Sequence, residues 1–116
     1  MNINRVILTG RLTRDVEVND HAELKVGKIR LAVDGYSRDG EERPTNFFDV
    51  TLFGKTAENC ARYIGKGSQI AVDGRLRWRE WEKDGQKRQA VEIAADQVQF
   101  LDPAKPREGA ADEIPF

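Results

Sequence analysis

Apolar and polar residues alternate along most of the chain, a pattern typical of strands that bury one face. It predicts strands over residues 3–12, 24–33, 47–53, 69–81 and 88–94, and a short segment at 98–101 that closes the sheet. One segment has a helical period instead, because apolar residues recur there at i, i+3, i+4 and i+7: Ala57, Cys60, Ala61 and Ile64. We expect Thr56 to cap this helix and Gly65 and Gly67 to end it.

The order strand, strand, strand, helix, strand, strand predicts an all-β fold. We expect a five-stranded Greek-key barrel of the oligonucleotide/oligosaccharide-binding (OB) type, with one short helix between the third and fourth strands. The pair Asp84-Gly85 is a hairpin signal after the fourth strand. Residues 38–45 are polar and contain Asp39-Gly40 and Pro44, which predicts an exposed connection between the second and third strands.

Length and composition limit the class of protein. With 116 residues and 39% hydrophobic content, the chain can build one modest core, which we expect within residues 1–101. Cys60 is the only cysteine and no apolar run is long, so we expect a soluble, cytoplasmic protein without disulfides or a membrane span. The formal charge is only −1, but a near-neutral chain can still bind nucleic acid if its arginines cluster on one face.

The composition changes after Leu101. Residues 102–111 contain no large apolar side chain, which predicts a disordered linker. The last five residues then combine two carboxylates, a β-branched side chain, a proline and a terminal phenylalanine: Asp112, Glu113, Ile114, Pro115 and Phe116. Such a peptide suits a hydrophobic pocket with a basic rim better than its own acidic chain, so we expect residues 112–116 to bind a partner protein.

Two predicted strands carry aromatic rings on their polar faces. In the third strand, Phe47 and Phe53 share a face with Asp49 and Thr51. In the fourth strand, one face carries three arginines and a tryptophan: Arg75, Arg77, Arg79 and Trp81. Binding of single strands without sequence preference requires cations for the phosphates and rings on which bases stack. The pattern therefore predicts that this face binds single-stranded nucleic acid.

The same residues allow other interpretations. Phe47 and Phe53 could pack under a loop or in a subunit interface, and the arginines could pair with nearby acids: Glu80, Glu82 and Glu92. Trp78 lies on the opposite face of its strand, with Leu76, which favours packing in the core or in an interface. An RNA-binding OB module or a protein-binding adaptor would use a similar face, so both remain alternative functions.

Enzyme chemistry is not visible in the sequence. His21 is the single histidine and lies in an acidic segment, and Cys60 belongs to the apolar stripe of the helix. No cluster has the spacing of metal ligands, and no nucleophile accompanies a base. We therefore expect no enzymatic activity, no cofactor and no metal site.

Several short segments, taken together and in order, resemble the bacterial single-stranded DNA-binding protein (SSB) family over nearly the whole chain. They are Asn4-Arg5-Val6-Ile7-Leu8, Gly10-Arg11-Leu12, Leu31-Ala32-Val33, Leu52-Phe53-Gly54-Lys55, Ala57-Glu58, Lys66-Gly67-Ser68-Gln69 and Asp73-Gly74-Arg75-Leu76. The terminal Asp-Glu-Ile-Pro-Phe resembles that family's acidic tip. The resemblance implies a nucleoid-associated homotetramer that binds and protects single-stranded DNA. It also implies that the tip recruits replication, recombination and repair proteins.

By position, the resemblance implies base stacking by Phe47, Phe53 and Trp81, the rings that the face pattern also selects. It implies phosphate contacts by five basic residues: Arg5, Lys55, Lys66, Arg77 and Arg79. A further stacking ring falls near Tyr36, where Ser37 can align instead. Residues 16–23 lack the family's usual proline and turn, so we expect a differently shaped first hairpin. The two-acid tip and the short linker imply weaker and more restricted recruitment of partners.

Overall fold

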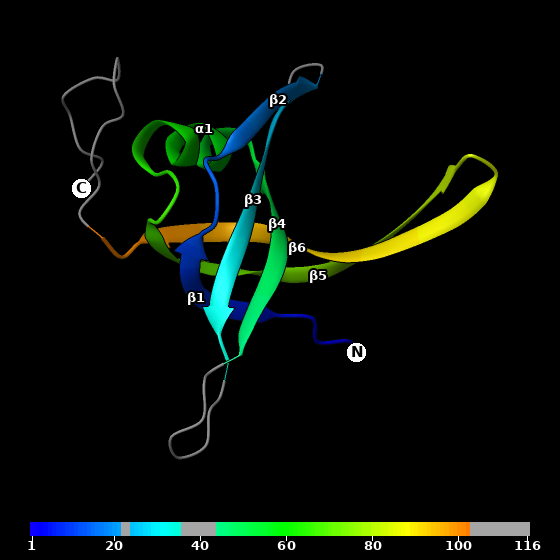
Figure 1. Cartoon of the computed structure of the whole chain (residues 1–116), viewed down its shortest axis with the longest axis horizontal. Coiled ribbons are helices and arrows are strands. Elements are labelled where there is room, and N and C mark those ends of the chain that lie inside the picture. Colours follow the sequence, from blue (N-terminus) through cyan, green and yellow to red (C-terminus); the bar gives the residue numbers. More distant parts are fainter. Residues whose placement is uncertain (22–23, 36–43, 103–116) are drawn as a thin grey trace.

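The computed structural model of the chain describes residues 1–21, 24–35 and 44–102 (Figure 1). In chain order its elements are β1 (Val6–Leu12), β2 (Glu17–His21), β3 (Leu24–Asp34), β4 (Thr45–Phe53), α1 (Gly54–Tyr63), β5 (Gln69–Lys83) and β6 (Gln86–Phe100). The predicted all-β class is confirmed, and the one helix of the described residues follows β4, which corresponds to the third predicted strand.

The strands form a closed ring. The sheet has the order β1-β5-β6-β4-β3-β2, and a further pairing of β1 with β3 closes it into a barrel. The closure lies at the end of β1, where Arg11 is opposite Ala32 and Leu12 is opposite Leu31. The five strands of this ring correspond to the predicted barrel.

The strands differ from the prediction in two places. An additional strand, β2, pairs with β3 in the segment where a differently shaped hairpin was expected. The predicted strands 88–94 and 98–101 are one continuous strand, β6, because a register shift opposite Asp73 and Gly74 lets it bend without a break. In the sequence, such a bulge interrupts the alternation of apolar and polar residues, so the pattern predicts two strands instead of one.

The core lies inside the ring and is closed at one end by α1, which packs against β3 (Figure 1). Its most buried side chains come from five strands and the helix: Leu12, Ile29, Leu31, Val50, Leu52, Ile70, Val72, Ile93, Ala57 and Cys60. Burial raises the pKa of the Cys60 thiol to about 12, so the thiol stays protonated near neutral pH. The interpretation of Cys60 as a core residue is therefore confirmed.

The helix starts earlier than predicted. Phe53 occupies the cap position without a side-chain hydrogen bond, so the predicted cap at Thr56 is wrong. Gly54 has a φ of +58°, which a glycine adopts without strain, and the chain therefore turns from β4 into the helix without a loop. The helix ends at Tyr63, just before the predicted Gly65.

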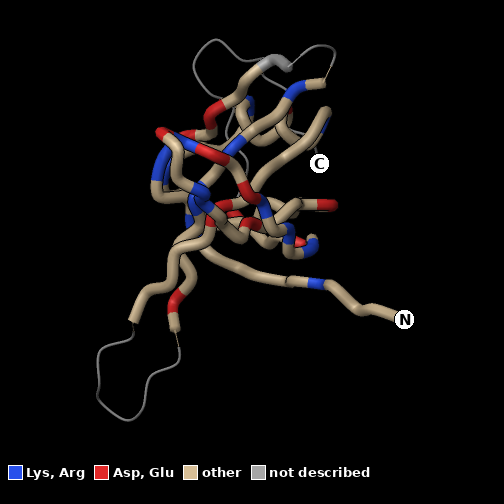
Figure 2. Tube along the Cα trace, turned by 90° about the vertical axis from the view of Figure 1, so that its right-hand side faces the viewer, with Lys and Arg blue, Asp and Glu red and all other residues tan. Residues whose placement is uncertain are grey.

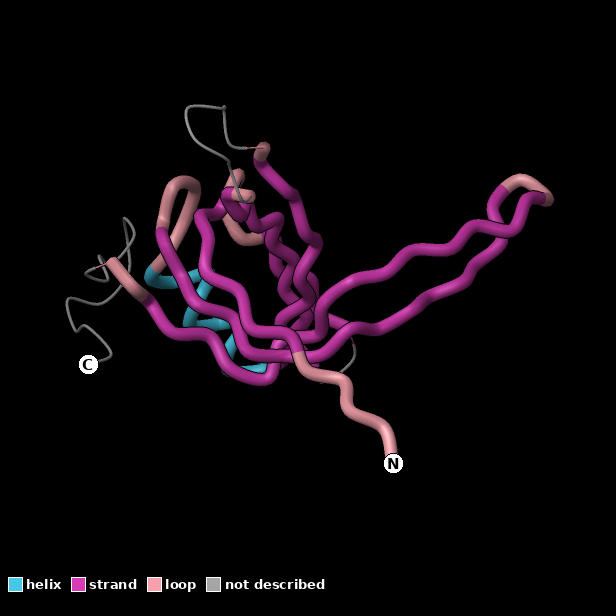
Figure 3. The backbone as a smooth tube through the Cα atoms, turned by 90° about the horizontal axis from the view of Figure 1, so that it is seen from below, coloured by secondary structure: helices cyan, strands magenta, loops and turns pink. Residues whose placement is uncertain are grey.

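Strands β5 and β6 continue beyond the barrel as a long antiparallel hairpin (Figure 1, Figure 3). Its predicted turn is present, with positive φ values at Asp84 (52°) and Gly85 (78°), as a type I′ turn requires. Within the barrel one face of β5 and β6 points into the core, but the hairpin beyond the barrel encloses no core. Two side chains on that face are therefore exposed, Trp78 by 58% and Val91 by 60%. Of the two positions predicted for Trp78, the core is thus wrong for the single chain, and an interface stays a prediction.

Candidate nucleic-acid interface

Outward-facing side chains of four neighbouring strands meet on one surface. Arg30 of β3 is directly opposite Asp49 of β4, and Arg77 of β5 is directly opposite Glu92 of β6. The hydroxyl of Thr51 donates to a carboxylate oxygen of Glu92 at 2.9 Å, which joins β4 to β6 on this side of the sheet. We call this surface the polar face and assign to it Lys28, Arg30, Phe47, Asp49, Thr51, Phe53, Arg77, Arg79, Trp81 and Glu92.

The three rings selected from the sequence lie at the surface. Phe47 is 51% exposed, Trp81 is 39% exposed, and Phe53 is half-buried at the point where β4 meets the helix. Phe47 and Phe53 are six residues apart on one strand, a spacing of about 20 Å. One base cannot reach both, so the rings offer separate stacking positions.

Each of these rings is accompanied by a guanidinium group. The distance from the guanidinium carbon to the ring centroid is 5.3 Å for Arg30 and Phe47, and 5.5 Å for Arg77 and Phe53. It is 5.0 Å for Arg79 and Trp81. These distances are within the range of cation–π attraction, which holds the arginine against the ring and brings a positive charge to each stacking position.

A buried carboxylate lies beneath two of these arginines. Glu92 is only 6% exposed, and it accepts hydrogen bonds from Arg77 Nε at 3.0 Å and from Thr51. Arg79 Nε lies 3.5 Å from the same carboxylate oxygen. Burial alone raises the pKa of Glu92, but the hydrogen bonds from Arg77 and Thr51 and the charges of both arginines outweigh it, so the pKa lies below its ordinary value. Glu92 is therefore ionised at neutral pH.

The arginines of β5 are paired with acids, as one interpretation of the sequence allowed. That interpretation is confirmed for Glu92, which binds Arg77 and Arg79, and Arg75 approaches Asp96 at 3.8 Å. On β3, Arg30 pairs with Asp49 at 3.0 Å. Figure 2 shows the same mixture over the barrel, where basic and acidic positions are interleaved. The polar face is therefore a surface of charge pairs and rings and not a uniformly basic patch.

The other predicted basic residues lie around this network. Lys55 is exposed in the first turn of α1, two positions after Phe53. Lys66 is exposed in the loop after α1, where its backbone N–H donates to Asp15 at 2.8 Å. Arg5 precedes β1 and pairs with Asp73 of β5. Tyr36, the linker beyond Asp102 and the predicted tip at 112–116 lie outside the described residues.

Sequence reasoning missed several members of this surface. Arg14 and Lys28 line a shallow hollow on the polar face together with Arg79 and Glu92; its other lining residues are Ile29, Asp49, Val50 and Thr51. Arg30 was also missed, although it lies against Phe47. The alternation along β3 could have shown that Lys28 and Arg30 face outward, because both flank the buried Ile29. Their position beside Phe47 and Asp49 depends on the cross-strand register, which the sequence does not give.

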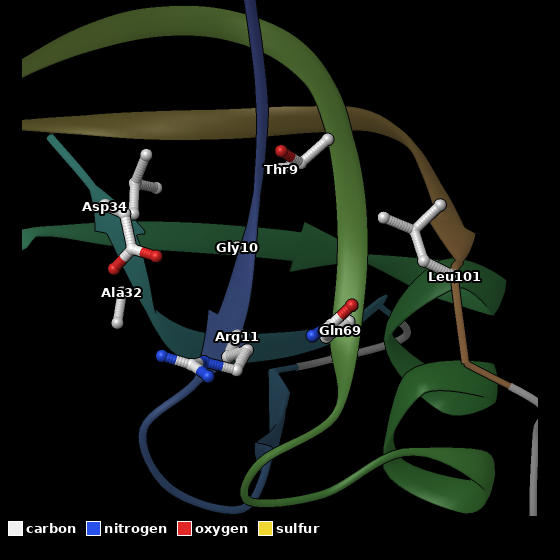
Figure 4. A pocket seen from close by; sticks show the side chains of 8 residues that line it. Thr9, Gly10, Arg11, Ala32, Asp34, Gln69 and Leu101 are labelled. Carbon is white, nitrogen blue, oxygen red and sulfur yellow. The ribbon is translucent and has the colours of Figure 1, made fainter. Parts of the chain in front are cut away.

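A second hollow lies at the seam where β1 meets β3 and β5 (Figure 4). It is lined by Thr9, Gly10, Arg11, Ala32, Val33, Asp34, Gln69 and Leu101, without an aromatic ring. It therefore lacks the surface on which a base would stack. Among the described residues, no group of histidine, cysteine and acidic side chains could hold a metal ion, and no helix there is long and apolar enough to span a membrane.

Comparisons with known proteins agree on one family. The profile described as the Single-strand binding protein family matches residues 3–101. "Single-stranded DNA-binding protein 2" of Staphylococcus aureus (strain Mu50) is 44% identical over 104 residues, which cover 87% of this chain and 74% of that protein. "Single-stranded DNA-binding protein" of Treponema pallidum (strain Nichols) is 40% identical over 103 residues, which cover 86% of this chain and 58% of the relative. The chain thus spans a little over half the length of the Treponema protein.

Proposed function

Because this chain belongs to the single-strand binding protein family, we propose that it binds single-stranded DNA without sequence preference through the polar face. One observation carries the proposal: each of three surface rings on the barrel and on the hairpin that continues from it has a guanidinium group within 5.0 to 5.5 Å of its centroid. Rings stack unpaired bases of any sequence, and cations attract the phosphates between them. The names of the Staphylococcus and Treponema relatives support DNA as the ligand.

We assign base stacking to Phe47, Phe53 and Trp81, with Tyr36 as a further candidate. The candidates for phosphate contacts are the basic residues around these rings: Arg5, Lys55, Lys66, Arg75, Arg77 and Arg79. A cation that is paired with an acid attracts a phosphate less strongly than an unpaired cation does. We therefore expect stacking to supply most of the affinity of the polar face for DNA. This binding involves no catalytic step.

The finer biological role is also a proposal. We propose that the chain protects single strands in the cytoplasm during replication, recombination and repair, and that residues 112–116 recruit partner proteins. The support is the acidic, phenylalanine-ended composition of this segment and the linker-like composition of residues 102–111. Removal of the tip should abolish capture of such partners without abolishing DNA binding.

We further propose that the protein is a homotetramer. The support is a set of apolar side chains that the single chain leaves about half exposed or more: Ile7, Leu76, Trp78 and Val91. Exposed apolar side chains gain from burial against a second copy. Light scattering should give the mass of four chains, and a monomeric mass at micromolar concentration would contradict this part of the proposal.

Binding to labelled homopolymers tests the function. Fluorescence anisotropy should show that a dT oligomer binds tightly and that affinity falls as salt is raised from about 50 to 200 mM, because phosphate contacts release counterions. A duplex of the same length should compete poorly, since its bases are not free to stack. Absence of dT binding at low salt would refute the proposal.

The RNA alternative is tested with the same assay. An rU oligomer of equal length carries the same phosphates and an unpaired pyrimidine, but adds a 2′-hydroxyl on each sugar. We expect dT to bind more tightly than rU. Tighter binding of rU would favour an RNA-binding module, and binding of neither would favour a protein-binding adaptor.

A further inference from the structure

Arg77 and Glu92 form the closest contact between opposite charges on the polar face. Two guanidinium nitrogens of Arg77 donate to one carboxylate oxygen of Glu92, Nε at 3.0 Å and a terminal nitrogen at 2.5 Å. The carboxylate is nearly inaccessible to solvent, with 7% of its side chain exposed, whereas 44% of the Arg77 side chain is exposed. The acid therefore lies under the arginine and holds it against the sheet.

The same guanidinium also contacts a stacking ring. Its carbon lies 5.5 Å from the centroid of Phe53, so one face of this ring is covered by a group that Glu92 fixes. The hydroxyl of Thr51 holds the other carboxylate oxygen of Glu92 at 2.9 Å. Glu92, Arg77 and Phe53 thus form a chain of contacts that runs from β6 over β5 to β4.

Arg79 differs from Arg77 in its relation to this acid. The approach of Arg79 to Glu92 is made by its Nε at 3.5 Å, which is longer than the two hydrogen bonds of Arg77. One carboxylate carries a single negative charge, which cannot neutralise two guanidinium groups. The excess positive charge is therefore associated with Arg79, which lies over Trp81.

We propose that Arg77 is a positioning residue for Phe53 and not a phosphate ligand, because Glu92 already neutralises the charge of Arg77. This inference rests on the proposed function and revises the role that family resemblance gives to Arg77. A cation already paired with a buried acid releases no counterion when a phosphate approaches, so it adds nothing to the salt dependence of binding. Arg79, whose charge Glu92 does not neutralise, does add to the salt dependence of binding.

The dependence of log K on log salt concentration measures this difference. Each phosphate contact with a single strand contributes about −0.7 to the slope. We expect the double variant R77Q/E92Q, which removes the two paired charges together, to weaken binding of a dT oligomer through loss of support for Phe53, while the slope stays at the wild-type value. R79Q, which changes the same residue type two positions along the same face, should make the slope shallower by about 0.7.

The variant Glu92→Gln tests whether Glu92 is the group that withholds the charge of Arg77 from the DNA. E92Q alone releases the charge of Arg77 and should make the slope steeper by about 0.7, and adding R77Q to E92Q should return the slope to the wild-type value. Glu80→Gln is the matched control, because it removes one negative charge from an exposed position of β5 that shares neither face nor contact with Arg77. E80Q should leave the slope at the wild-type value.

Two results would overturn the inference. If R77Q/E92Q makes the slope shallower by about 0.7, Arg77 is an ordinary phosphate ligand; if E92Q alone leaves the slope unchanged, Glu92 is not what withholds the charge of Arg77. Thermal unfolding shows which variants fold. If the E92Q variants do not, R77K, which keeps the charge but not the two-nitrogen contact with Glu92, should weaken binding without changing the slope, and unchanged affinity of R77K would contradict the positioning role. A wild-type protein that does not bind dT would instead be a failure of the proposed function.

Discussion

Trp78 and Trp81 are three positions apart on β5, and because successive side chains of a strand alternate between its faces, the two rings lie on opposite faces. Trp81 lies on the polar face beside the guanidinium of Arg79. The indole N–H of Trp78 donates to Gln89 at 3.0 Å on the other side of the hairpin. We therefore expect the two tryptophans to have different roles, although they are the same residue type on one strand.

The pH dependence of stability tests the charge state of Glu92. Its folded pKa lies below the ordinary value of 4.5, so its pairing stabilises the fold above about pH 4.5, and this stabilisation is lost as the pH falls through the lowered folded pKa. We expect E92Q to be less stable than the wild type at neutral pH, with a difference that narrows on acidification. Urea unfolding between about pH 7 and pH 3 measures this. A constant difference, or equal narrowing for E80Q, would contradict the assignment.

At the scale of elements, closure of the barrel depends on a close approach of β1 to β3. A Cβ atom at Gly10 would lie 2.4 Å from the carbonyl oxygen of Ala32, and this contact is with backbone that cannot rotate away. Ala32 pairs with Arg11, the residue after Gly10, where β1 changes its partner from β5 to β3. The absence of a side chain at Gly10 therefore allows the close approach of the two strands at this point of the ring.

Gly10→Ala should consequently destabilise the barrel. We expect a loss of about 1 to 3 kcal/mol in the free energy of unfolding, because the added methyl group must push two strands apart. Thr9→Ala is the control, since it changes an exposed neighbour on the same strand. Chemical denaturation of both variants gives the comparison, and equal stability would show that the seam relaxes without cost.

Much of the architecture could be predicted from alternation and turn signals. Parity along β4 and β5 placed Phe47, Phe53 and Trp81 on one side, and Asp84-Gly85 marked the hairpin turn. Local pattern could not reveal that the hairpin leaves the barrel, so it could not show that Trp78 and Val91 are exposed in the single chain. It also could not reveal cross-strand register, which determines that Arg30 lies against Phe47 and that Glu92 lies beneath Arg77.

At the scale of the whole molecule, the proposal separates DNA binding by the barrel from partner binding by the last five residues. The acidic tip would compete with phosphate for the same arginines. Deletion of residues 112–116 should therefore leave the affinity for a dT oligomer unchanged or slightly increased. The variant D112N/E113Q keeps the length of the chain and should behave like the deletion. Weaker DNA binding after either change would refute the division of roles.

The most direct test of the polar face compares the two tryptophans of β5. Affinity for a dT oligomer of about eight nucleotides, short enough to lie on one barrel, is measured for W81A, W78A and the wild type. The account predicts that W81A loses about 1 to 3 kcal/mol of binding free energy, through loss of one stacking position, while W78A binds as the wild type does. Unchanged binding by W81A, or an equal loss in W78A, would contradict it.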